Sequence, residues 1–346
     1  MKKSVATIRD VAAAAGVSTA TVSKFVNGAQ RFSPAVEARL TSTIEELGYR
    51  SNPMAQSMIT GRTKAIGLSV LDITNPHYAS VVKGANRVAQ AHGYTLLLVD
   101  TEETPERERH LLEALSRRVD GMIVYSRTPE EELGWLLALD RPSVFFGRPD
   151  LIKLPSVASD DQLGAFMVAR HLLAQGHTRV GYMGFANSRR NPERMAGVRE
   201  ALAAQGLELH VFDADGPTSA AGEKLGSAIM LGRQPLDALI CFNDLLALGF
   251  MKAVQTLGFQ VPDDISVVGF DNIQFGSFAS PALTSVDLNS EQMGAAAMQK
   301  LLASIEGQEV EPLTVINAQL MLRASTAARS YSATLRNSTS MSPGLG

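Results

Sequence analysis

The chain has 346 residues, of which 45% are hydrophobic and 19% are charged, so it can bury a large core and is not a disordered protein. At about 150 residues per domain, this length predicts two or three domains. The formal net charge of −3 is unevenly distributed. Residues 1–64 carry nine lysines and arginines against four acids, which is +5, whereas the remainder carries 23 against 31, which is −8. We therefore expect only the N-terminal part to meet a polyanion.

Several classes of protein are disfavoured by simple patterns. The single cysteine, Cys241, lies in an apolar run and is expected to be a buried, inert thiol. The six histidines show no metal-ligand spacing, so we expect neither a metal nor a cofactor. No run of about 18 apolar residues predicts a membrane span. Arg9 and Asp10 interrupt the first apolar stretch, which excludes a secretory signal there, and we expect a cytoplasmic protein.

Residues 1–48 predict a helix-turn-helix domain. Thr7 begins a capping box for a first helix, whose apolar positions recur with helical spacing, and Gly16 ends it. Ser18 caps a second helix, and Ser33, which precedes a proline, starts a third. Two short helices around a glycine turn, followed by a third helix, are typical of this motif.

The second helix of this domain has a slim polar face, formed by Ala20, Ser23, Lys24 and Asn27. A helix that enters the DNA major groove needs small, hydrogen-bonding side chains that do not repel phosphate, so this face favours DNA binding. The alternative is a small structural bundle that merely exposes a polar face.

From Ala65 onward, short β-rich runs alternate with helical stretches. The runs cover residues 65–71, 95–100, 121–125, 142–146, 179–185, 238–242 and 265–270. Such apolar strands separated by helices indicate parallel sheets covered on both faces. About 260 residues of this pattern predict two doubly wound lobes in tandem. Polar residues directly follow several strands, and ligands bind at the carboxyl ends of such strands, so we expect a common cleft there.

The domain boundaries follow from these changes of pattern. We expect a head over residues 1–48, a hinge helix and linker over 49–64, a core over 65–327 and a disordered, serine-rich tail over 328–346. Within the core we expect a first lobe at about 65–159 and 289–316, and a second lobe at about 160–288 and 317–327. The stretch Pro53–Met58 predicts one short helix that is unstable alone in water.

Several segments resemble one known family. TIRDVAAAAGVSTATVSKFVNG (Thr7–Gly28) is similar to the DNA-binding head of the lactose/galactose-repressor (LacI/GalR) family of bacterial transcription regulators, and YRSNPMAQSM is similar to its hinge helix. Landmarks of the family's effector-binding core follow in order, among them IGLSVLDITNPHYASVVKG, ISVVGFDN and PALTSVD. The resemblance covers about residues 5–327. It implies an all-α helix-turn-helix head joined to a core of two lobes like that of periplasmic binding proteins.

The resemblance implies a homodimer in which each head reads one half of a near-palindromic operator. The positions that match the family's base-reading residues are Thr19, Ala20 and Lys24. Those that match its contacts to the DNA backbone are Thr7, Ser18, Thr21, Ser23, Asn27, Arg31, Ser33 and Tyr49. Those that match its minor-groove hinge contacts are Asn52, Ala55 and Met58, where the flexible methionine would wedge into a base step.

The resemblance also places a small-molecule effector in the cleft between the lobes. The matching positions are Asp72, Asn75, His77, Tyr78, Phe146, Arg148, Arg190, Arg194, Asn243 and Asp271. Arginine, aspartate and an aromatic face suit a carbohydrate, and the added positive charge extends the expectation to a sugar, a sugar phosphate or a sugar acid. Plainer interpretations stay open: Asn243 as a helix cap, Asp271 in a turn, His77 and Tyr78 as core packing, and Arg189 and Arg190 as solvated surface side chains.

The preferred hypothesis is a ligand-controlled transcription regulator, usually a repressor in this family. The alternative is a sugar-binding protein of a transport system, which has the same two-lobed core. An enzyme is not expected, because the sequence contains no dinucleotide-binding glycine loop, no phosphate-binding loop and no nucleophile elbow.

Overall fold

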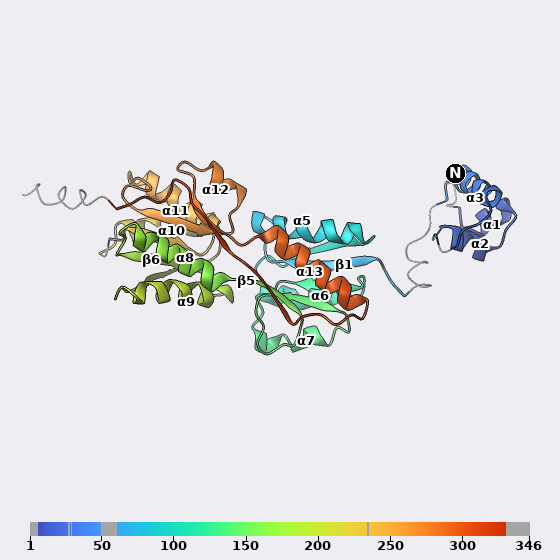
Figure 1. Ribbon diagram of the computed structural model, residues 1–346, viewed down its shortest axis with the longest axis horizontal. Helices are drawn as coiled ribbons and strands as arrows, with labels where there is room; N and C mark the ends of the chain where they lie inside the picture. The colour runs from blue at the N-terminus through green and yellow to red at the C-terminus, as the bar shows by residue number, and fades with distance from the viewer. Residues whose placement is uncertain (1–5, 27, 29, 50–60, 234, 330–346) are drawn as a thin grey trace, which may run out of the picture. The chain divides into compact units, whose positions relative to one another are not determined.

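The computed structural model describes residues 6–26, 28, 30–49, 61–233 and 235–329. These residues form two compact units that divide between Lys64 and Ala65, a helical head and an α/β core (Figure 1). The predicted fold class is confirmed. No described helix is both long enough and apolar enough to cross a membrane.

The head consists of three helices: α1 (Ile8–Ala15), α2 (Thr19–Val26) and α3 (Pro34–Leu47). The predicted capping box is present, because the Thr7 amide donates to Asp10 Oδ2 (2.8 Å) and the Asp10 amide donates to Thr7 Oγ1 (3.4 Å). Gly16 ends α1 with a φ of 63°, a conformation that favours glycine. Ser33 precedes α3, but its side chain makes no capping hydrogen bond.

The apolar sides of the three helices form one small core. Its fully buried members are Val11, Ala12, Ala15, Val22 and Leu40. The Tyr49 side chain packs against this cluster from the end of the described head. The packing fixes which side of α2 faces outward.

The first lobe contains a six-stranded parallel sheet in the order β11-β5-β4-β3-β1-β2. Its strands are β1 (Ala65–Val70), β2 (Thr95–Asp100), β3 (Gly121–Val124), β4 (Ser143–Phe146), β5 (Ser156–Ser159) and β11 (Leu313–Ile316). Helices α5 (Pro76–Ala91) and α13 (Ser290–Ile305) pack on one face. The other face is covered by α6 (Pro105–Ser116) and α7 (Gly134–Leu137), which follows the short 3-10 turn η1 (Glu130–Glu132).

The second lobe contains a six-stranded sheet in the order β12-β10-β9-β8-β6-β7, parallel except for the β10–β12 pair. Its strands are β6 (Val180–Gly184), β7 (His210–Asp213), β8 (Ala238–Cys241), β9 (Ser266–Phe270), β10 (Thr284–Asp287) and β12 (Gln319–Met321). Its helices are α8 (Asp161–Ala174), α9 (Arg190–Ala203), α10 (Ser219–Met230), α11 (Asp244–Thr256) and α12 (Gln274–Phe278). The pairs α8/α9 and α10/α11 cover opposite faces.

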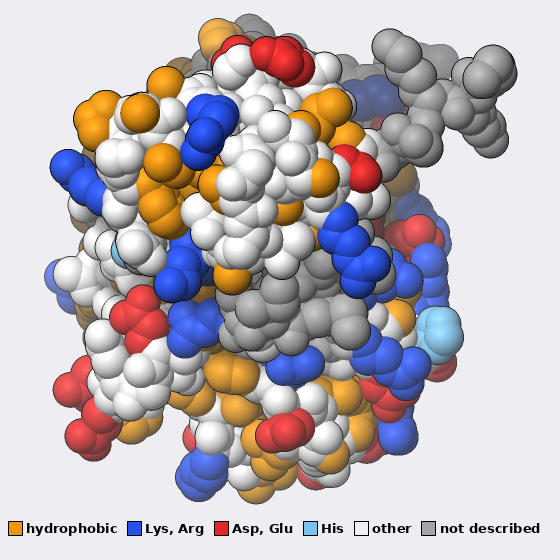
Figure 2. Space-filling model, turned by 90° about the vertical axis from the view of Figure 1, so that its right-hand side faces the viewer, with side chains coloured by type: hydrophobic (Ala, Val, Ile, Leu, Met, Phe, Trp, Pro, Cys, Tyr) orange, Lys and Arg blue, Asp and Glu red, His pale blue; other side chains and the backbone are white. Residues whose placement is uncertain are grey.

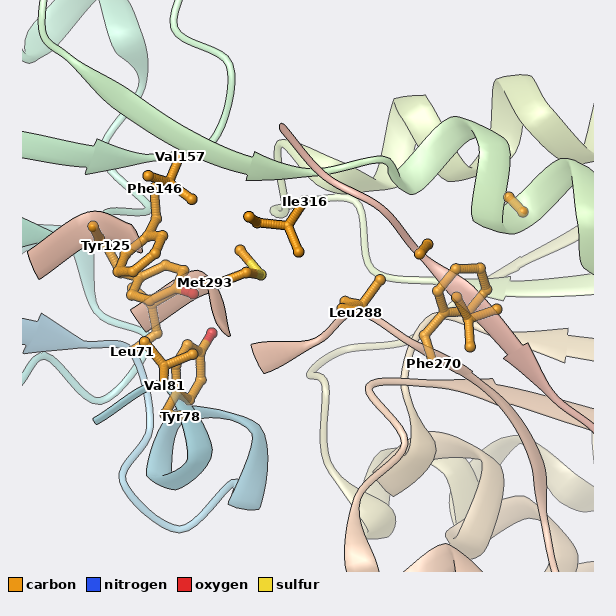
Figure 3. Packing of buried hydrophobic residues seen from close by; sticks show 14 of the residues in the cluster. Leu71, Tyr78, Val81, Tyr125, Phe146, Val157, Phe270, Leu288, Met293 and Ile316 are labelled. Carbon is orange, nitrogen blue, oxygen red and sulfur yellow. The ribbon is translucent and has the colours of Figure 1, made fainter. Parts of the chain in front are cut away.

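The chain passes between the lobes three times: after β5, after β10 and after β11. One buried apolar cluster continues through these crossings (Figure 3). Leu288 and Ile316 lie on two of the crossing segments and are 0% and 6% exposed, and Phe270 continues the cluster in the second lobe. The lobes are therefore joined by packed side chains as well as by chain connectivity.

Helices α5 and α13 lie side by side (Figure 1) and approach closely through two glycines. A Cβ added at Gly294 would lie 1.9 Å from the carbonyl oxygen of Val81, and one added at Gly84 would lie 1.9 Å from the carbonyl oxygen of Glu291. Only glycine fits at these two positions.

Seven strands match the predicted apolar runs, and five strands were not predicted from the pattern: β5, β7, β10, β11 and β12. Each has three or four residues, and several carry serine or threonine, as in the sequence SVAS of β5. The strands β11 and β12 pair with β5 and β10, which lie far away in the chain, and a local pattern does not reveal such pairing.

Two predicted segments flank the core. The predicted hinge helix over residues 53–58 lies outside the described residues. At the other end, Arg329 belongs to the segment expected to be disordered, yet its amide donates to the Gln175 carbonyl (2.9 Å) and its guanidinium contacts Asp237 (2.7 Å). The beginning of that segment is therefore held on the second lobe.

Candidate ligand cleft and nucleic-acid interface

The outward side of α2 is the candidate surface for reading DNA bases. Thr19, Ala20 and Lys24 are exposed, whereas Val22 is 0% exposed beneath them. Lys24 Nζ donates to Gln30 Oε1 at 3.2 Å, a contact between exposed groups that water or DNA can replace. The three side chains thus share one accessible face.

The candidate DNA-backbone contacts divide by exposure. Thr7, Ser18, Arg31 and Ser33 are exposed, and Thr21, Ser23 and Tyr49 are half-buried. Ser18 Oγ accepts from the Thr21 amide (3.1 Å) and bonds Thr21 Oγ1 (2.9 Å), so both hydroxyls also serve the start of α2. Asn27, Asn52, Ala55 and Met58 lie outside the described residues. Lysine and arginine side chains are interspersed with acidic and uncharged ones on the face shown in Figure 2.

A cavity of about 80 Å³ lies between the two lobes of the core. Nine of the ten predicted effector residues line it: Asn75, His77, Tyr78, Phe146, Arg148, Arg190, Arg194, Asn243 and Asp271. The structure does not bring Asp72 to the lining. Its Oδ1 instead accepts from the amide (2.8 Å) and hydroxyl (2.6 Å) of Thr74, which closes a local turn.

Three helices begin at this cavity. Asn75 precedes α5, Arg189 precedes α9 and Asn243 precedes α11, and all three residues line the cavity. This follows from the topology, because each helix starts where a parallel strand ends. The positive ends of three helix dipoles are therefore close to any bound molecule.

Arg194 is the most deeply buried charged group of the site, with 1% of its surface exposed. Its guanidinium carbon lies over the rings of Phe242 and Phe270, at 4.6 Å and 4.3 Å from their centroids. Nε donates to Asp161 Oδ1 at 2.7 Å, and Nη1 donates to the carbonyl of Phe242. Arg194 thus has protein partners in addition to its place in the lining.

Asp161 serves two arginines of the cavity. Besides Arg194, Arg190 Nε lies 4.0 Å from Asp161 Oδ2, and Ser159 Oγ donates to the same carboxylate at 2.5 Å. Burial acts to raise the pKa of Asp161, but the two guanidinium groups and the hydrogen bonds outweigh it and hold this pKa below its usual value. Asp161 is therefore ionised at neutral pH.

Aromatic rings form one wall of the cavity (Figure 3). Tyr125 stacks on Phe146 with ring centroids 4.1 Å apart and planes at 17°, and Tyr78 meets Tyr125 edge-on at 5.1 Å. From the other lobe, the Arg190 guanidinium carbon lies 5.7 Å from the Tyr125 centroid. This wall offers a flat apolar face bordered by charge.

His77 and Asp271 face each other across the lobes. His77 Nδ1 lies 2.8 Å from Ser290 Oγ and 3.8 Å from Asp271 Oδ1. Burial, reinforced by Arg190, Arg194 and Arg127, puts the pKa of His77 well below its usual value, so the ring is neutral at neutral pH. Burial raises the pKa of Asp271 to about 6, against the opposing effect of the arginines.

Three buried polar atoms of the lining have no hydrogen-bond partner within the described part of the chain. They are His77 Nε2, Tyr125 Oη and Arg190 Nη2, although the Arg190 guanidinium lies near the Tyr125 hydroxyl and opposes the rise in its pKa that burial causes. Buried polar groups normally have partners, and a group left without one costs about 1–3 kcal/mol. The unsatisfied atoms are therefore candidates for contact with a ligand or with water.

The lining also includes residues outside the predicted set: Leu71, Glu103, Tyr125, Ser126, Arg127, Gly147, Ser188, Arg189, Glu193, Pro217 and Phe242. Tyr125 and Phe242 directly follow β3 and β8. Assigning to the cleft every residue that directly follows a parallel strand would therefore have found both of them. Arg127 and Arg189 reach across between the lobes, and no local signal indicates such a reach.

These contacts between the lobes are specific. Arg127 Nη1 donates to Ser188 Oγ at 3.2 Å, while its other nitrogens bind Glu103. Arg189 Nη1 donates to the carbonyl of Ser126 at 2.8 Å, and Nη2 donates to the carbonyl of Thr128. These hydrogen bonds connect the loop after β3 with the start of α9.

A single carboxylate, Glu108, holds the loop after β3. It is 0% exposed and accepts from the amide of Arg127 (2.6 Å), from the hydroxyl of Ser126, and from the hydroxyl (2.6 Å) and amide (3.2 Å) of Thr128. Glu108 therefore fixes the two carbonyls that accept from Arg189, although it does not line the cavity itself.

Asn243 lines the cavity and also caps helix α11, the alternative role considered for it in the sequence analysis. Its Oδ1 accepts from the Leu246 amide at 2.9 Å, and its Nδ2 donates to the Pro217 carbonyl at 2.8 Å. Both ends of the side-chain amide are thus occupied, which limits what Asn243 can offer a ligand.

The chemistry of the cavity is that of binding. It combines arginine and tyrosine donors, a carboxylate acceptor in Asp271 and a stacked aromatic wall. No group of histidine, cysteine, aspartate and glutamate residues in the described ranges could hold a metal ion.

Comparison with known proteins agrees with this geometry. Residues 7–52 match the model of bacterial regulatory proteins of the lacI family, and residues 169–326 match a periplasmic binding protein-like domain. The chain is 31% identical over 329 residues to the HTH-type transcriptional repressor PurR of Photobacterium profundum, covering 92% of this chain and 98% of that protein.

Two solved structures extend the comparison. A lac repressor dimer bound to operator and the anti-inducer ONPF superposes with a TM-score of 0.85 at 25% identity, covering 94% of this chain and all of that chain. A complex of the transcriptional regulator CelR with cellobiose superposes with a TM-score of 0.69 at 28% identity, covering 92% and 99%. With this level of identity over nearly the whole chain, the protein belongs to the lacI family of bacterial regulatory proteins.

Proposed function

We propose that this chain is a DNA-binding transcription regulator, a repressor that binds a near-palindromic operator as a homodimer and responds to a small carbohydrate-type effector. The observation that carries the proposal is the combination of an exposed reading face on α2 with an interlobe cavity whose buried polar atoms lack partners within the described residues. Neither feature alone distinguishes a regulator from a simple binding protein.

In this proposal the head reads bases through Thr19, Ala20 and Lys24. Thr19 offers a hydroxyl and a methyl group, Ala20 offers an apolar contact, and Lys24 donates to a base edge as a point charge. The backbone contacts assigned to the surrounding hydroxyls and to Arg31 set affinity and register. Two symmetric heads require two symmetric half-sites.

The hinge couples the head to the core. A pair of short helices that fold only on the operator, with Met58 inserted in the minor groove, would make DNA binding sensitive to the spacing of the two attached cores. A ligand that favours one arrangement of the lobes shifts the population of dimers able to form this pair.

The effector site is assigned to the cavity between the lobes. A sugar ring can lie against the Tyr125–Phe146 wall, while Asp271 accepts from its hydroxyls and Arg190 donates to its oxygens. The cavity of about 80 Å³ is smaller than the roughly 300–1,000 Å³ typical of ligand sites, so in this proposal the cavity widens when the effector binds. The cellobiose bound to the related CelR supports a carbohydrate-type effector, with a sugar, a sugar phosphate and a sugar acid as the candidates.

The second candidate is a sugar-binding protein of a transport system, which the match of residues 169–326 to a periplasmic binding protein-like domain favours. Both candidates are binding proteins, in agreement with relatives that are repressors, so we propose no catalytic role. DNA binding distinguishes them, because a transport protein has no use for an operator.

The test is a gel-shift titration of the full chain with DNA from upstream of its own gene, against random DNA of equal length. A regulator binds the upstream DNA far more tightly and loses affinity steeply as salt rises. Equal, weak binding to both DNAs would overturn the proposal and favour the transport protein.

A further inference from the structure

The three unpartnered atoms of the cavity come from both lobes. His77 and Tyr125 belong to the first lobe and are 3% and 4% exposed, and Arg190 belongs to the second. The rings of His77 and Tyr125 lie 6.4 Å apart, and the Arg190 guanidinium lies 5.7 Å from the Tyr125 ring. The three side chains are therefore neighbours in the lining of the same cavity.

All three atoms can act as hydrogen-bond donors at the same time. A guanidinium nitrogen only donates, and a tyrosine hydroxyl has one proton to give. When Ser290 Oγ donates to His77 Nδ1, the proton of the neutral ring is on Nε2, which then donates as well. A group of donors suits an oxyanion, which accepts three or more hydrogen bonds and donates none, whereas each hydroxyl of a sugar also brings a proton that needs an acceptor.

The charges around the cavity also favour an anionic ligand. Arg127 pairs with Glu103, Arg148 with Glu193 (3.4 Å) and Arg194 with Asp161 (2.7 Å). Arg189 donates to two carbonyls instead, and within the described residues Arg190 forms an ion pair only with the shared Asp161, at 4.0 Å. Among the described residues, neither arginine at the start of α9 thus forms an ion pair with a carboxylate other than the shared Asp161, and the helix dipole adds to their charge.

Asp271 occupies the other side of the same space. Its carboxylate lies 3.8 Å from His77 Nδ1, on the side of the ring away from Nε2. A carboxylate there repels an anion but accepts from hydroxyl groups. The cavity therefore has one side suited to an oxyanion and one side suited to hydroxyls.

Building on the proposed function, we infer that the effector is a polyhydroxylated anion, a sugar acid or a sugar phosphate, whose carboxylate or phosphate is bound by Arg190, Tyr125 and His77. Because these residues come from both lobes, the anionic group connects the lobes directly. A neutral sugar can accept from Arg190 only through uncharged oxygens, which bind a guanidinium more weakly than a carboxylate or phosphate does.

The experiment measures thermal stabilisation of the full chain by matched probes. Glucose, gluconate and glucose 6-phosphate form one set, galactose, galactonate and galactose 6-phosphate form a second, and inorganic phosphate is added alone. The variants are Arg190→Gln and Tyr125→Phe, with Arg199→Gln as the matched control, because Arg199 is an exposed arginine of the same helix outside the cavity.

We expect at least one anionic probe to raise the melting temperature of the wild type at concentrations where its neutral counterpart does not. Arg190→Gln should weaken that probe about 10- to 100-fold, as expected for a lost hydrogen bond to a charged group, and Tyr125→Phe about 3- to 10-fold, whereas Arg199→Gln should match the wild type. Stabilisation by the sugar acids, gluconate and galactonate, or by the sugar phosphates then shows which class of anion is bound.

Three results would overturn the inference. Neutral sugars could bind as well as their anionic counterparts, or Arg190→Gln could bind the anions as tightly as the wild type does. In the third, no anionic probe, inorganic phosphate included, stabilises the wild type more than it stabilises Arg190→Gln. Operator binding measured on the same samples separates this inference from the proposed function. If a neutral sugar changes operator affinity, only the inference fails. If anions bind in the cleft but no DNA binds, only the proposed function fails.

Discussion

Arg190 and Tyr125 belong to different lobes of the core, yet the guanidinium carbon lies 5.7 Å from the centre of the tyrosine ring, and each side chain has a buried polar atom without a partner in the described part of the chain. A molecule that satisfies both atoms must touch both lobes. Under the proposed function, in which a ligand in the cleft changes DNA binding, this is the contact through which it would act.

Replacing Lys24 by alanine tests the reading face of α2. Lys24 is exposed and its Nζ donates to the exposed Gln30, so we expect the variant to fold normally. Binding to single-base variants of the operator should change at one symmetric position, by about 1–3 kcal/mol of discrimination. Unchanged relative affinities across all operator variants would remove Lys24 from base recognition.

The Arg194→Ala variant should lose the effector response and also lose stability. Removing the guanidinium leaves Asp161, a carboxylate that is 3% exposed, without its nearest cation, and breaking a buried pair costs about 3–5 kcal/mol. Urea unfolding measures this loss. The double variant Arg194→Met/Asp161→Asn should recover part of the stability but not the response. An Arg194→Ala protein with normal stability and a normal effector response would show that this pair is unimportant.

Glu108→Gln tests how the loop after β3 is positioned. The amide group of glutamine adds a donor where Glu108 only accepts, so at least one of its four hydrogen bonds is lost, at a cost of about 1–3 kcal/mol. Looser carbonyls at Ser126 and Thr128 should weaken effector binding without changing operator affinity. Glu113→Gln, an exposed change on the same helix, is the control and should alter stability by less than about 1 kcal/mol. Equal effects of the two changes would argue against a positioning role.

Asp271 should make the free energy of unfolding fall as the pH rises, whereas a carboxyl whose pKa is lowered by folding makes it rise. Burial raises its pKa in the folded protein to about 6, above the ordinary 3.8, so the folded state binds the proton more tightly than the unfolded state does. The cost of ionising Asp271 is absent below about pH 4 and complete above about pH 7, where it reaches up to about 3 kcal/mol. Asp271→Asn should therefore gain stability relative to the wild type as the pH rises through about 6. Urea unfolding between about pH 4 and 8 measures the difference, and a constant difference would contradict the assignment.

The sequence predicts some parts of this molecule well, for physical reasons. The strands of five or six residues, such as β1 and β9, are apolar enough to recognise locally, and polar residues that follow strands, such as Asp271, reach the cleft because parallel strands end at one edge. Asp72 also follows a strand, but Thr74 is close enough in the chain to capture its carboxylate.

Other parts could not be predicted from local patterns. Whether Arg189 is solvated or bound depends on two carbonyls 61 and 63 residues earlier in the chain, held in place by the still more distant Glu108. The unpartnered atoms of His77, Tyr125 and Arg190 emerge only when the two lobes are placed together. The class of ligand is therefore a property of the tertiary structure.

The most direct test of the central claim is the operator affinity of the full chain with and without a cleft ligand, measured by fluorescence anisotropy for the wild type and for Arg190→Gln. The ligand is the probe that most stabilises the wild type. We predict that it shifts the operator affinity of the wild type at least tenfold, and that Arg190→Gln binds the operator normally but responds only at much higher ligand concentration. An equal response of both proteins, or operator affinity that no cleft ligand changes, would contradict the account.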